Sequence, residues 1–146
     1  MLKYLSLAAL VALSGPTAMA AQEAPELRII DAGDAELQDF AWSARPLVVF
    51  ANSPLDPNFV EQMELIRERP EDLAEREVVV IVDTDPDEMS PIRSELRPNG
   101  FMFVLVGKDG QKYLRKPFPW SVREMTRSID KMPIRLQEIE KARTVR

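Results

Sequence analysis

The sequence predicts an α/β fold, in which a central mixed β-sheet is flanked by helices and is built as a βαβ unit followed by a ββα unit. Two continuous apolar runs, residues 47–50 and 78–82, have the length and composition of strands that are buried on both faces of a sheet. A segment with helical periodicity separates the runs. A hairpin and a well-capped helix follow the second run, and together these observations predict the fold class.

The segment ahead of the first buried run contains two weaker elements. Residues 27–30 ("LRII") are expected to form a short edge strand. Residues 34–42 ("DAELQDFAW") are expected to form a short helix or turn that directs Leu37, Phe40 and Trp42 inward.

The helix between the two runs has a clear start signal. Asp56 is placed to cap it, and Pro57 falls at the first helical position, where a missing N–H costs nothing. The apolar residues that recur at helical spacing and predict its buried face are Phe59, Val60, Met63 and Ile66. Pro70 then marks a break and a short turn, and residues 90–96 ("SPIRSEL") predict one or two helical turns beyond the second run.

The ββα unit begins with a hairpin. Asp109 and Gly110 form a dipeptide that is typical of a tight turn with positive φ, and residues 101–106 and 112–116 supply the two strands. The order of all these elements is that of the thioredoxin fold.

The last helix of the unit is expected to start at Ser121, with Glu124 completing a capping box. Its predicted buried stripe consists of Val122, Met125, Ile129 and Met132. Pro133 is expected to end or kink this helix, which leaves residues 134–146 as a polar tail that can itself be helical.

Four stretches, in this order along the chain, carry a family resemblance: "RPLVVF", "LAEREVVVI", "VLVGKDGQKYLR" and "IDKMPIRLQEI". They resemble the pattern of the bacterial family catalogued as domain of unknown function 4174, over roughly residues 37–140. The resemblance implies a thioredoxin- or peroxiredoxin-like fold that bacteria export. No activity is established for the bacterial members, so the resemblance transfers no catalytic residue.

Composition excludes several chemistries. The chain has no cysteine and no histidine, and its formal net charge is −5. Thiol–disulfide exchange, a Ser-His-Asp triad and imidazole metal sites are therefore excluded for this chain alone. The mildly acidic, mixed charge pattern predicts no binding to nucleic acid.

The first residues predict a signal peptide over residues 1–20. Lys3 precedes an apolar run, and Ala18-Met19-Ala20 is a small-x-small pattern that places the cut between Ala20 and Ala21. The run is short for a membrane anchor, which is the other interpretation. We therefore expect a single thioredoxin-like domain, residues 21–146, that is periplasmic or secreted and is free of the membrane after cleavage.

The loop between the first buried run and its helix is the first candidate site. In thioredoxin-like proteins this junction holds the reactive cysteines over a helix N-terminus, whereas here it reads Asn52-Ser53-Pro54-Leu55-Asp56. Ser53 has no histidine to deprotonate it, and Asp56 is expected to occupy the amides as a cap. A structural turn is one interpretation. The other is a ligand-binding edge formed by Asn52, Ser53, Asp56, Asp83 and Asp85, because parallel strands present their carboxyl ends together.

The acidic loop after the second run is the other candidate. Asp83, Asp85, Asp87 and Glu88 offer oxygen ligands of the kind that Ca²⁺ needs. The match to an EF-hand fails at Pro86 and lacks the central glycine and the late glutamate. A solvated loop is the alternative interpretation.

Two further groups have structural and functional interpretations. Lys108, Arg115 and Arg135 are expected to pair with acidic residues such as Asp130, or else to form an anion site. The other basic residues considered with them are Arg93, Arg97 and Lys112. The aromatic and methionine residues expected in the core are Trp42, Phe59, Met63, Trp120, Met125 and Met132.

These observations favour a non-catalytic exported domain, without redox chemistry and with no cofactor, that binds a protein or small molecule in the periplasm. The alternative is a Ca²⁺-dependent protein or enzyme that uses the acidic loop, so enzymatic activity stays open.

Overall fold

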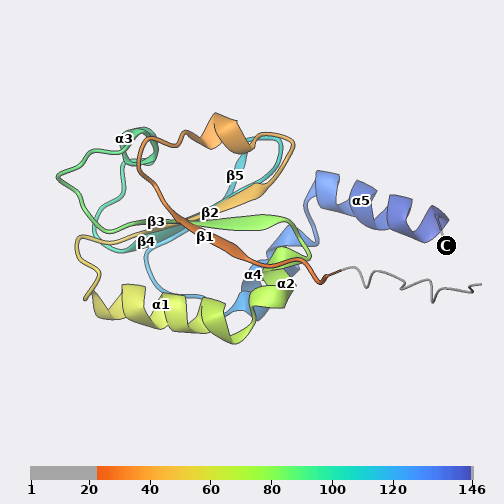
Figure 1. Cartoon of the computed structure of the whole chain (residues 1–146), viewed down its shortest axis with the longest axis horizontal. Helices are drawn as coiled ribbons and strands as arrows, with labels where there is room; N and C mark the ends of the chain where they lie inside the picture. Colours follow the sequence, from red (N-terminus) through yellow and green to blue (C-terminus); the bar gives the residue numbers. More distant parts are fainter. Residues whose placement is uncertain (1–22, 146) are drawn as a thin grey trace, which may run out of the picture.

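A five-stranded mixed sheet runs through the centre of the protein, whose computed structural model describes residues 23–145 (Figure 1). Its strands are β1 (Arg28–Asp31), β2 (Arg45–Phe50), β3 (Val78–Asp83), β4 (Met102–Val106) and β5 (Lys112–Lys116), in the spatial order β1-β3-β2-β4-β5. β1 and β2 flank β3 in parallel, β4 runs antiparallel to β2, and β5 runs antiparallel to β4. The predicted α/β fold class is thereby confirmed. The predicted signal peptide lies outside the described residues.

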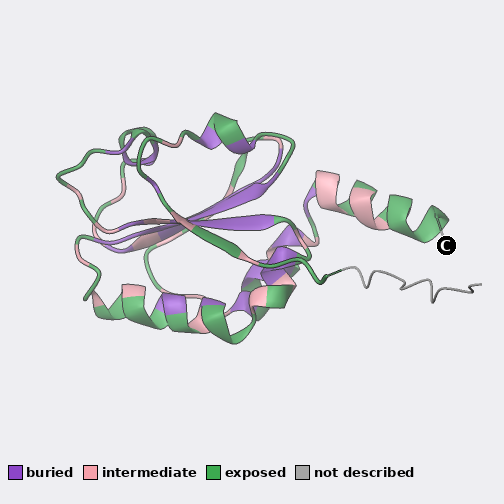
Figure 2. Ribbon diagram, viewed as in Figure 1, coloured by how far each residue is buried: buried purple, intermediate pink, exposed green. Residues whose placement is uncertain are grey.

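Helices cover both faces of this sheet. α1 (Pro57–Glu68), α2 (Pro70–Ala74) and α4 (Val122–Ile129) pack on one face, and a 3₁₀ helix (Leu37–Phe40) and α3 (Pro91–Leu96) on the other (Figure 1). Because successive strand residues point to opposite faces, Val49 joins the first core cluster and Val48 the second. β2 is therefore buried along its whole length and β3 is buried except at Val82, which is partly exposed, as their continuous apolar runs predict (Figure 2).

Side-chain caps start α1, α3 and α4, and the caps of α1 and α4 are the predicted ones. An Asp56 carboxylate oxygen accepts a hydrogen bond from the amide of Asn58 at 2.8 Å. Ser121 and Glu124 form the expected capping box at the start of α4. Ser90 caps α3 by accepting from the amide of Arg93 at 3.1 Å. Local polar chemistry thus sets where these helices begin.

Two core predictions are wrong. The side chain of Trp42 is 68% exposed, since the chain reverses after the 3₁₀ helix and holds this residue at a φ of +62°. The amide of Trp42 donates to the carbonyl of Lys108, which fixes the backbone and turns the indole outward. Val60 is exposed because α1 packs on the sheet through a narrower stripe that includes Met63 and Ile66.

The break predicted at Pro70 is instead the start of a helix. Pro70 is the first residue of α2, because a proline at this position loses no hydrogen bond. The predicted hairpin connection, residues 107–111, is confirmed, and within its Asp109-Gly110 pair only Gly110 has a positive φ, of +82°. α4 ends at Ile129, and Pro133 is the first residue of a separate helix, α5 (Pro133–Thr144), so the helical interpretation of the tail is confirmed.

α5 lies beyond the end of the sheet at which β2 starts, at the right in Figure 1. None of the helices in the described part of the chain combines the length and the apolar character needed to cross a membrane.

Candidate functional site

The carboxyl ends of β2 and β3 bring the two candidate loops together. Phe50 lies opposite Asp83 in the parallel register, and the amide of Ala51 donates to the carbonyl of Asp83 at 3.0 Å. The loops that follow therefore leave the sheet side by side, at the left in Figure 1. The expectation that both loops line one edge is confirmed.

In the first loop, polar atoms are directed at the local backbone. Asp56 caps α1, and the hydroxyl of Ser53 accepts a hydrogen bond from the amide of Leu55 at 3.1 Å. Asn52 is exposed. Because Asp56 already occupies the first amides of α1, the dipole that would activate a nucleophile here instead stabilises a carboxylate. This geometry supports a rigid turn and supplies no activated group.

In the second loop, Asp83 is buried and fully engaged. One of its oxygens accepts from Nε and Nη2 of Arg93 at 3.1 and 2.9 Å, and the other accepts from the hydroxyl of Ser90 at 2.5 Å. Nη2 of Arg93 also reaches the carbonyls of Ala51 and Asp83, at 3.0 and 3.1 Å. The guanidinium carbon stands 5.3 Å from the ring centroid of Phe50. Arg93 thus clamps the ends of β2 and β3 together.

The sequence-based interpretation missed this clamp because it assigned Arg93 to a general basic set. A signal was present, since an aspartate ends a buried strand and an arginine follows Ser90-Pro91 on the next helix. An arginine there has the reach to satisfy a carboxylate that the sheet buries.

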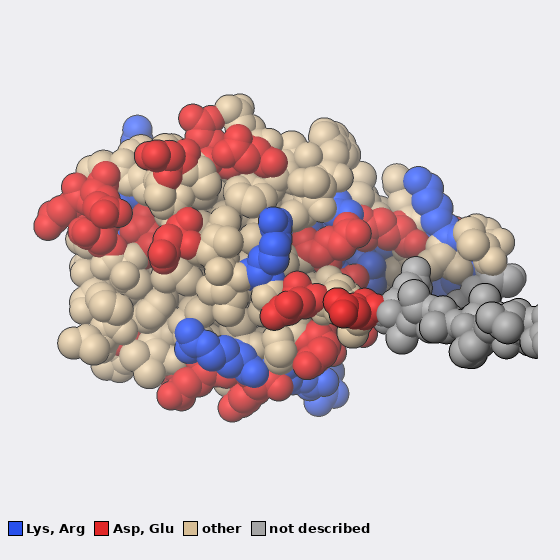
Figure 3. All heavy atoms as spheres, in the orientation of Figure 1, with Lys and Arg blue, Asp and Glu red and all other residues tan. Residues whose placement is uncertain are grey.

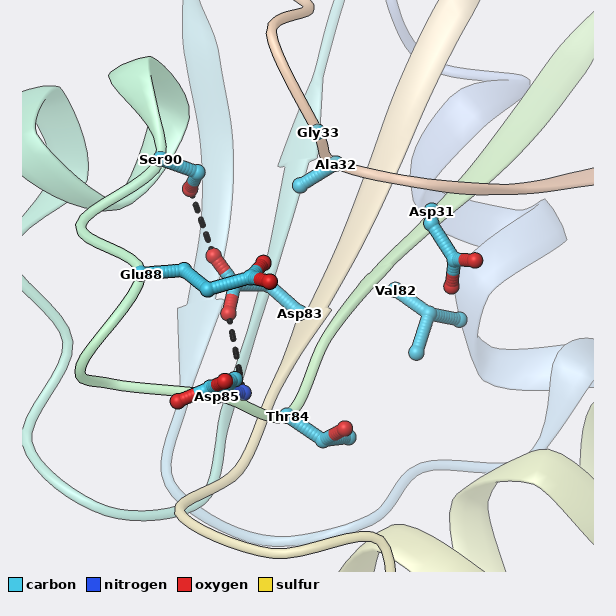
Figure 4. A pocket seen from close by; sticks show the side chains of 9 residues that line it. All are labelled: Asp31, Ala32, Gly33, Val82, Asp83, Thr84, Asp85, Glu88 and Ser90. Carbon is cyan, nitrogen blue, oxygen red and sulfur yellow. Dashed lines mark hydrogen bonds between the residues drawn. The ribbon is translucent and has the colours of Figure 1, made fainter.

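A small cavity of about 160 Å³ lies between the carboxyl ends of β1 and β3 (Figure 4). Its lining residues are Asp31, Ala32, Gly33, Val82, Asp83, Thr84, Asp85, Glu88 and Ser90. Asp85 accepts a hydrogen bond from the amide of Asp87 at 3.0 Å, so part of its capacity stabilises the loop.

This arrangement bears on the calcium alternative. Ca²⁺ takes six to eight oxygen ligands, and the carboxylate of Asp83 is committed to Arg93 and Ser90. Within residues 23–145, no group of three or more acidic side chains is placed to hold a metal ion. Binding of Ca²⁺ through Asp83 would therefore require its ion pair with Arg93 to break.

Three exposed apolar side chains stand at this end of the sheet, and the sequence-based interpretation did not single them out. Leu55 is 83% exposed in the first loop, Met89 is 60% exposed in the second, and Phe118 is 53% exposed between β5 and α4. Met89 also has a φ of +46°, an uncommon backbone conformation for a side chain of this size. Their common position follows from topology, because β2, β3 and β5 all end at this edge.

Exposed carboxylates accompany these apolar side chains. Asp85, Asp87 and Glu88 lie within the β3–α3 loop and are exposed, and Figure 3 shows acidic side chains gathered at the left of the molecule above an uncharged area. The carboxyl end of the sheet therefore combines apolar and acidic surface.

Two of the three basic residues that were expected to pair, Lys108 and Arg135, form ion pairs. The ammonium group of Lys108 pairs with Glu77 and, at 2.7 Å, with Glu138. Arg135 pairs with Asp130 at 3.3 Å, as predicted. Arg115 is an exception, because its guanidinium donates to the carbonyl of Arg97 instead of to an acid.

Comparison with solved structures supports the fold. The chain is 14% identical to the reduced 2-Cys peroxiredoxin of Plasmodium vivax, with a TM-score of 0.56, over 73% of this chain and 85% of that one. It is 18% identical to Plasmodium yoelii Prx1a, from the structure of an N-terminally modified form, with a TM-score of 0.52 over 73% and 81%. At these identities the likeness concerns the thioredoxin fold alone.

No curated protein matches the chain. The profile of one family matches residues 36–138, which include all of the strands except β1 and run into α5. The boundaries agree with those of the resemblance seen in the sequence. The chain belongs to the family described as domain of unknown function (DUF4174).

Proposed function

We propose that this chain is a non-catalytic binding module, exported to the periplasm or beyond, which holds a polypeptide partner at the carboxyl end of its sheet. The partner is a segment in which apolar side chains alternate with lysine or arginine. The observation that carries the proposal is the group of exposed apolar side chains, Leu55, Met89 and Phe118, beside exposed carboxylates at one end of the sheet.

Binding is favoured over catalysis by the chemistry of the loops. Ser53 and Asp56 hydrogen bond to nearby amides, and Asp83 is tied to Arg93. The chain has neither cysteine nor histidine to act as nucleophile or base. What this end offers is a rigid surface, because the two loops are fixed by caps and by the Arg93 clamp.

The class of partner follows from the surface. When a partner covers an exposed apolar side chain, the complex is stabilised by roughly 25 cal/mol for every Å² of apolar surface removed from water. The exposed acids Asp85, Asp87 and Glu88 complement cationic side chains and would speed association with them. Arg97 and Lys116 stand on the β4–β5 side of the same end, so a cationic segment is expected to lie toward the β3–α3 loop.

Fluorescence anisotropy with a labelled synthetic peptide of alternating leucine and lysine tests this proposal. The wild-type chain is expected to bind this peptide more tightly than a matched peptide of leucine and glutamate. The double variant Leu55→Ser/Phe118→Ser is expected to bind about tenfold more weakly or worse, because it removes two central apolar contacts. The matched control is Trp42→Ser, which removes an exposed apolar side chain from the other end of the sheet.

Equal affinity of the wild type and the double variant for the leucine–lysine peptide would contradict the proposal. A loss of affinity in Trp42→Ser but not in the double variant would also contradict it. The calcium alternative is tested by measuring the melting temperature of the same proteins with and without Ca²⁺. A rise in the melting temperature at millimolar Ca²⁺, abolished by Asp85→Asn, would favour that alternative instead.

Export is tested with the full chain expressed in a Gram-negative host. The protein in the periplasmic fraction is expected to begin at Ala21, as the Ala18-Met19-Ala20 pattern predicts. Recovery of the chain from the cytoplasm with residues 1–20 intact would contradict this part of the proposal.

A further inference from the structure

α5 is attached to the protein without a hydrophobic core of its own. None of its residues is buried, Leu136 is exposed, and Ile134 and Ile139 are only partly covered (Figure 2). Residues 140–145 are all exposed, so the second half of the helix lacks close packing. A helix of this length is marginal by itself in water. Its position must therefore depend on the contacts of its first half.

Those contacts centre on the carboxylate of Glu138. One oxygen accepts from Nη2 of Arg45 at 3.1 Å and lies 3.4 Å from Nη1 of Arg135, and the other accepts from the ammonium group of Lys108 at 2.7 Å. Arg45 comes from the first residue of β2, and Lys108 from the β4–β5 connection. Two distant parts of the sheet thus converge on one side chain of α5.

The cations that hold Glu138 belong to the body of the protein. Arg45 is 0% exposed and Lys108 is also buried. Nη1 of Arg45 donates to the carbonyl of Arg76 at 2.7 Å, but Nε is buried and has no hydrogen-bond partner within the part of the chain that the structure describes. A buried cation is costly without a counter-charge, and a buried donor without an acceptor adds to that cost. Lys108 has Glu77 as a second partner, whereas Glu138 is the acidic partner of Arg45 within the described residues. Arg45 therefore requires a carboxylate at this place.

We propose that Arg45 and Lys108 form a carboxylate-binding site, that Glu138 is its tethered occupant, and that α5 is a displaceable cover. A ligand with a free carboxylate takes the place of Glu138 and releases α5 from the sheet. We infer that the ligand carries a carboxylate because the side chain of Glu138 already binds there. Its two carboxylate oxygens contact cations from two different elements. Nε of Arg45, which has no partner within the described residues, is able to donate one more hydrogen bond. This site shares no residue with the carboxyl end of the sheet. The test of this proposal is therefore independent of the test of the proposed function.

The first test uses the variant Glu138→Ala with acetate as the probe. Its melting temperature is measured in sodium acetate and in sodium chloride at equal ionic strength and neutral pH. At ten times the dissociation constant of acetate, the melting temperature is expected to lie about 3–5 °C higher in acetate. The control Glu140→Ala removes an exposed glutamate from the same helix and should show no such difference.

The second test uses the wild-type chain and reads the release of α5. Cleavage by trypsin after Arg135 requires the helix to open, and its rate is followed by mass spectrometry in the same two salts. Acetate at ten times its dissociation constant is expected to raise this rate about tenfold, because it captures the open state. Cleavage after Arg123, in α4, should stay the same in both salts.

The outcomes separate the proposal from a structural ion pair. The proposal is overturned if acetate raises the melting temperature of Glu138→Ala no more than that of Glu140→Ala. It is also overturned if acetate raises the melting temperature of the double variant Lys108→Ala/Glu138→Ala as much as that of Glu138→Ala. Either result would show a general salt effect. If Glu138→Ala does not fold, the trypsin measurement decides, and equal cleavage after Arg135 in acetate and chloride overturns the proposal.

Discussion

The two ends of the sheet each contain a buried arginine paired with a carboxylate, and the two pairs are built in opposite ways. At the carboxyl end, the carboxylate of Asp83 is buried on a central strand, and Arg93 reaches it from α3 at 2.9 Å. At the other end, Arg45 is buried on a central strand, and Glu138 reaches it from the peripheral helix α5 at 3.1 Å.

The difference concerns what each pair holds. Arg93 and Asp83 are ten residues apart, and Arg93 also binds two main-chain carbonyls, so that this pair joins strand ends that are already packed. Arg45 and Glu138 are 93 residues apart, and their pair attaches a helix that has no fully buried residue. The same chemistry therefore serves as an internal clamp at one end and as the attachment of a peripheral helix at the other.

The largest expected effect is at the clamp. Arg93→Ala leaves the carboxylate of Asp83 buried without its counter-charge, so we expect a loss of about 3–5 kcal/mol in the free energy of unfolding. Urea denaturation measures it. The exposed arginine variant Arg127→Ala should change stability by no more than about 0.5 kcal/mol. Equal effects of the two variants would show that the clamp does not hold the strand ends.

At the other end, Glu138→Gln removes the charge but keeps the size of the side chain. The expected loss is about 1–2 kcal/mol, smaller than for a fully buried pair because Glu138 is partly exposed. Glu140→Gln, on the same helix, is the matched control, with an expected change of no more than about 0.5 kcal/mol. If Glu138→Gln lowers the free energy of unfolding as much as Arg93→Ala does, the two ion pairs do not differ in the way described above.

Acid should loosen the attachment of α5. A hydrogen bond from Arg76 lowers the pKa of Asp130 against the opposing effect of burial, and Arg135 adds to the lowering. Burial alone would raise the pKa of Glu138, but Lys108 and Arg45 together bring that pKa below its usual value. The native state therefore binds fewer protons than the unfolded state. The stabilisation is complete above the usual pKa values, 3.8 and 4.5, and is lost as the pH falls through the lowered ones.

Urea denaturation between pH 7 and pH 2.5 measures this effect. The difference in stability between the wild type and Asp130→Asn/Glu138→Gln is expected to shrink toward zero at the acid end. A difference that stays constant over this range would contradict the assigned pKa directions.

The smallest effect concerns the β4–β5 connection beside Lys108. The hydroxyl of Tyr113 donates to the carboxylate of Asp109 at 2.7 Å, and this bond, more than burial, raises the pKa of Tyr113. Tyr113→Phe is expected to cost about 1 kcal/mol. The stabilisation is present below the usual pKa of 10.0 and is lost as the pH rises through the raised value. Spectrophotometric titration at 295 nm should show ionisation above pH 10, and a transition at or below it would contradict the assigned direction.

The backbone at Gly107 leaves no space for a side chain in this connection. A Cβ atom built on Gly107 would stand 2.5 Å from Cε2 of Tyr113 and 2.6 Å from a carboxylate oxygen of Asp109. The glycine is therefore needed for close approach. This is a tertiary reason that the turn signal at Asp109 and Gly110 does not reveal.

Local patterns determined the elements of this fold. Continuous apolar runs specified β2 and β3. A strand that is buried on both faces of a sheet has apolar residues at successive positions, whereas a half-exposed strand alternates apolar and polar residues. Asp56, Ser90 and Ser121 specified helix starts, because capping depends only on side chains next to the first turn. The absence of cysteine and histidine excluded thiol–disulfide and imidazole chemistry without any structure.

Tertiary structure decided which charges meet and which apolar side chains stay outside. Arg45 and Glu138 are neighbours only because α5 returns to the start of β2, and Arg93 meets Asp83 only because α3 packs over the end of β3. Trp42 and Leu55 are exposed because the backbone around them is fixed by hydrogen bonds to Lys108 and Ser53. A capping residue acts over one helical turn, whereas an ion pair and an exposed surface depend on the relative placement of elements distant in the chain.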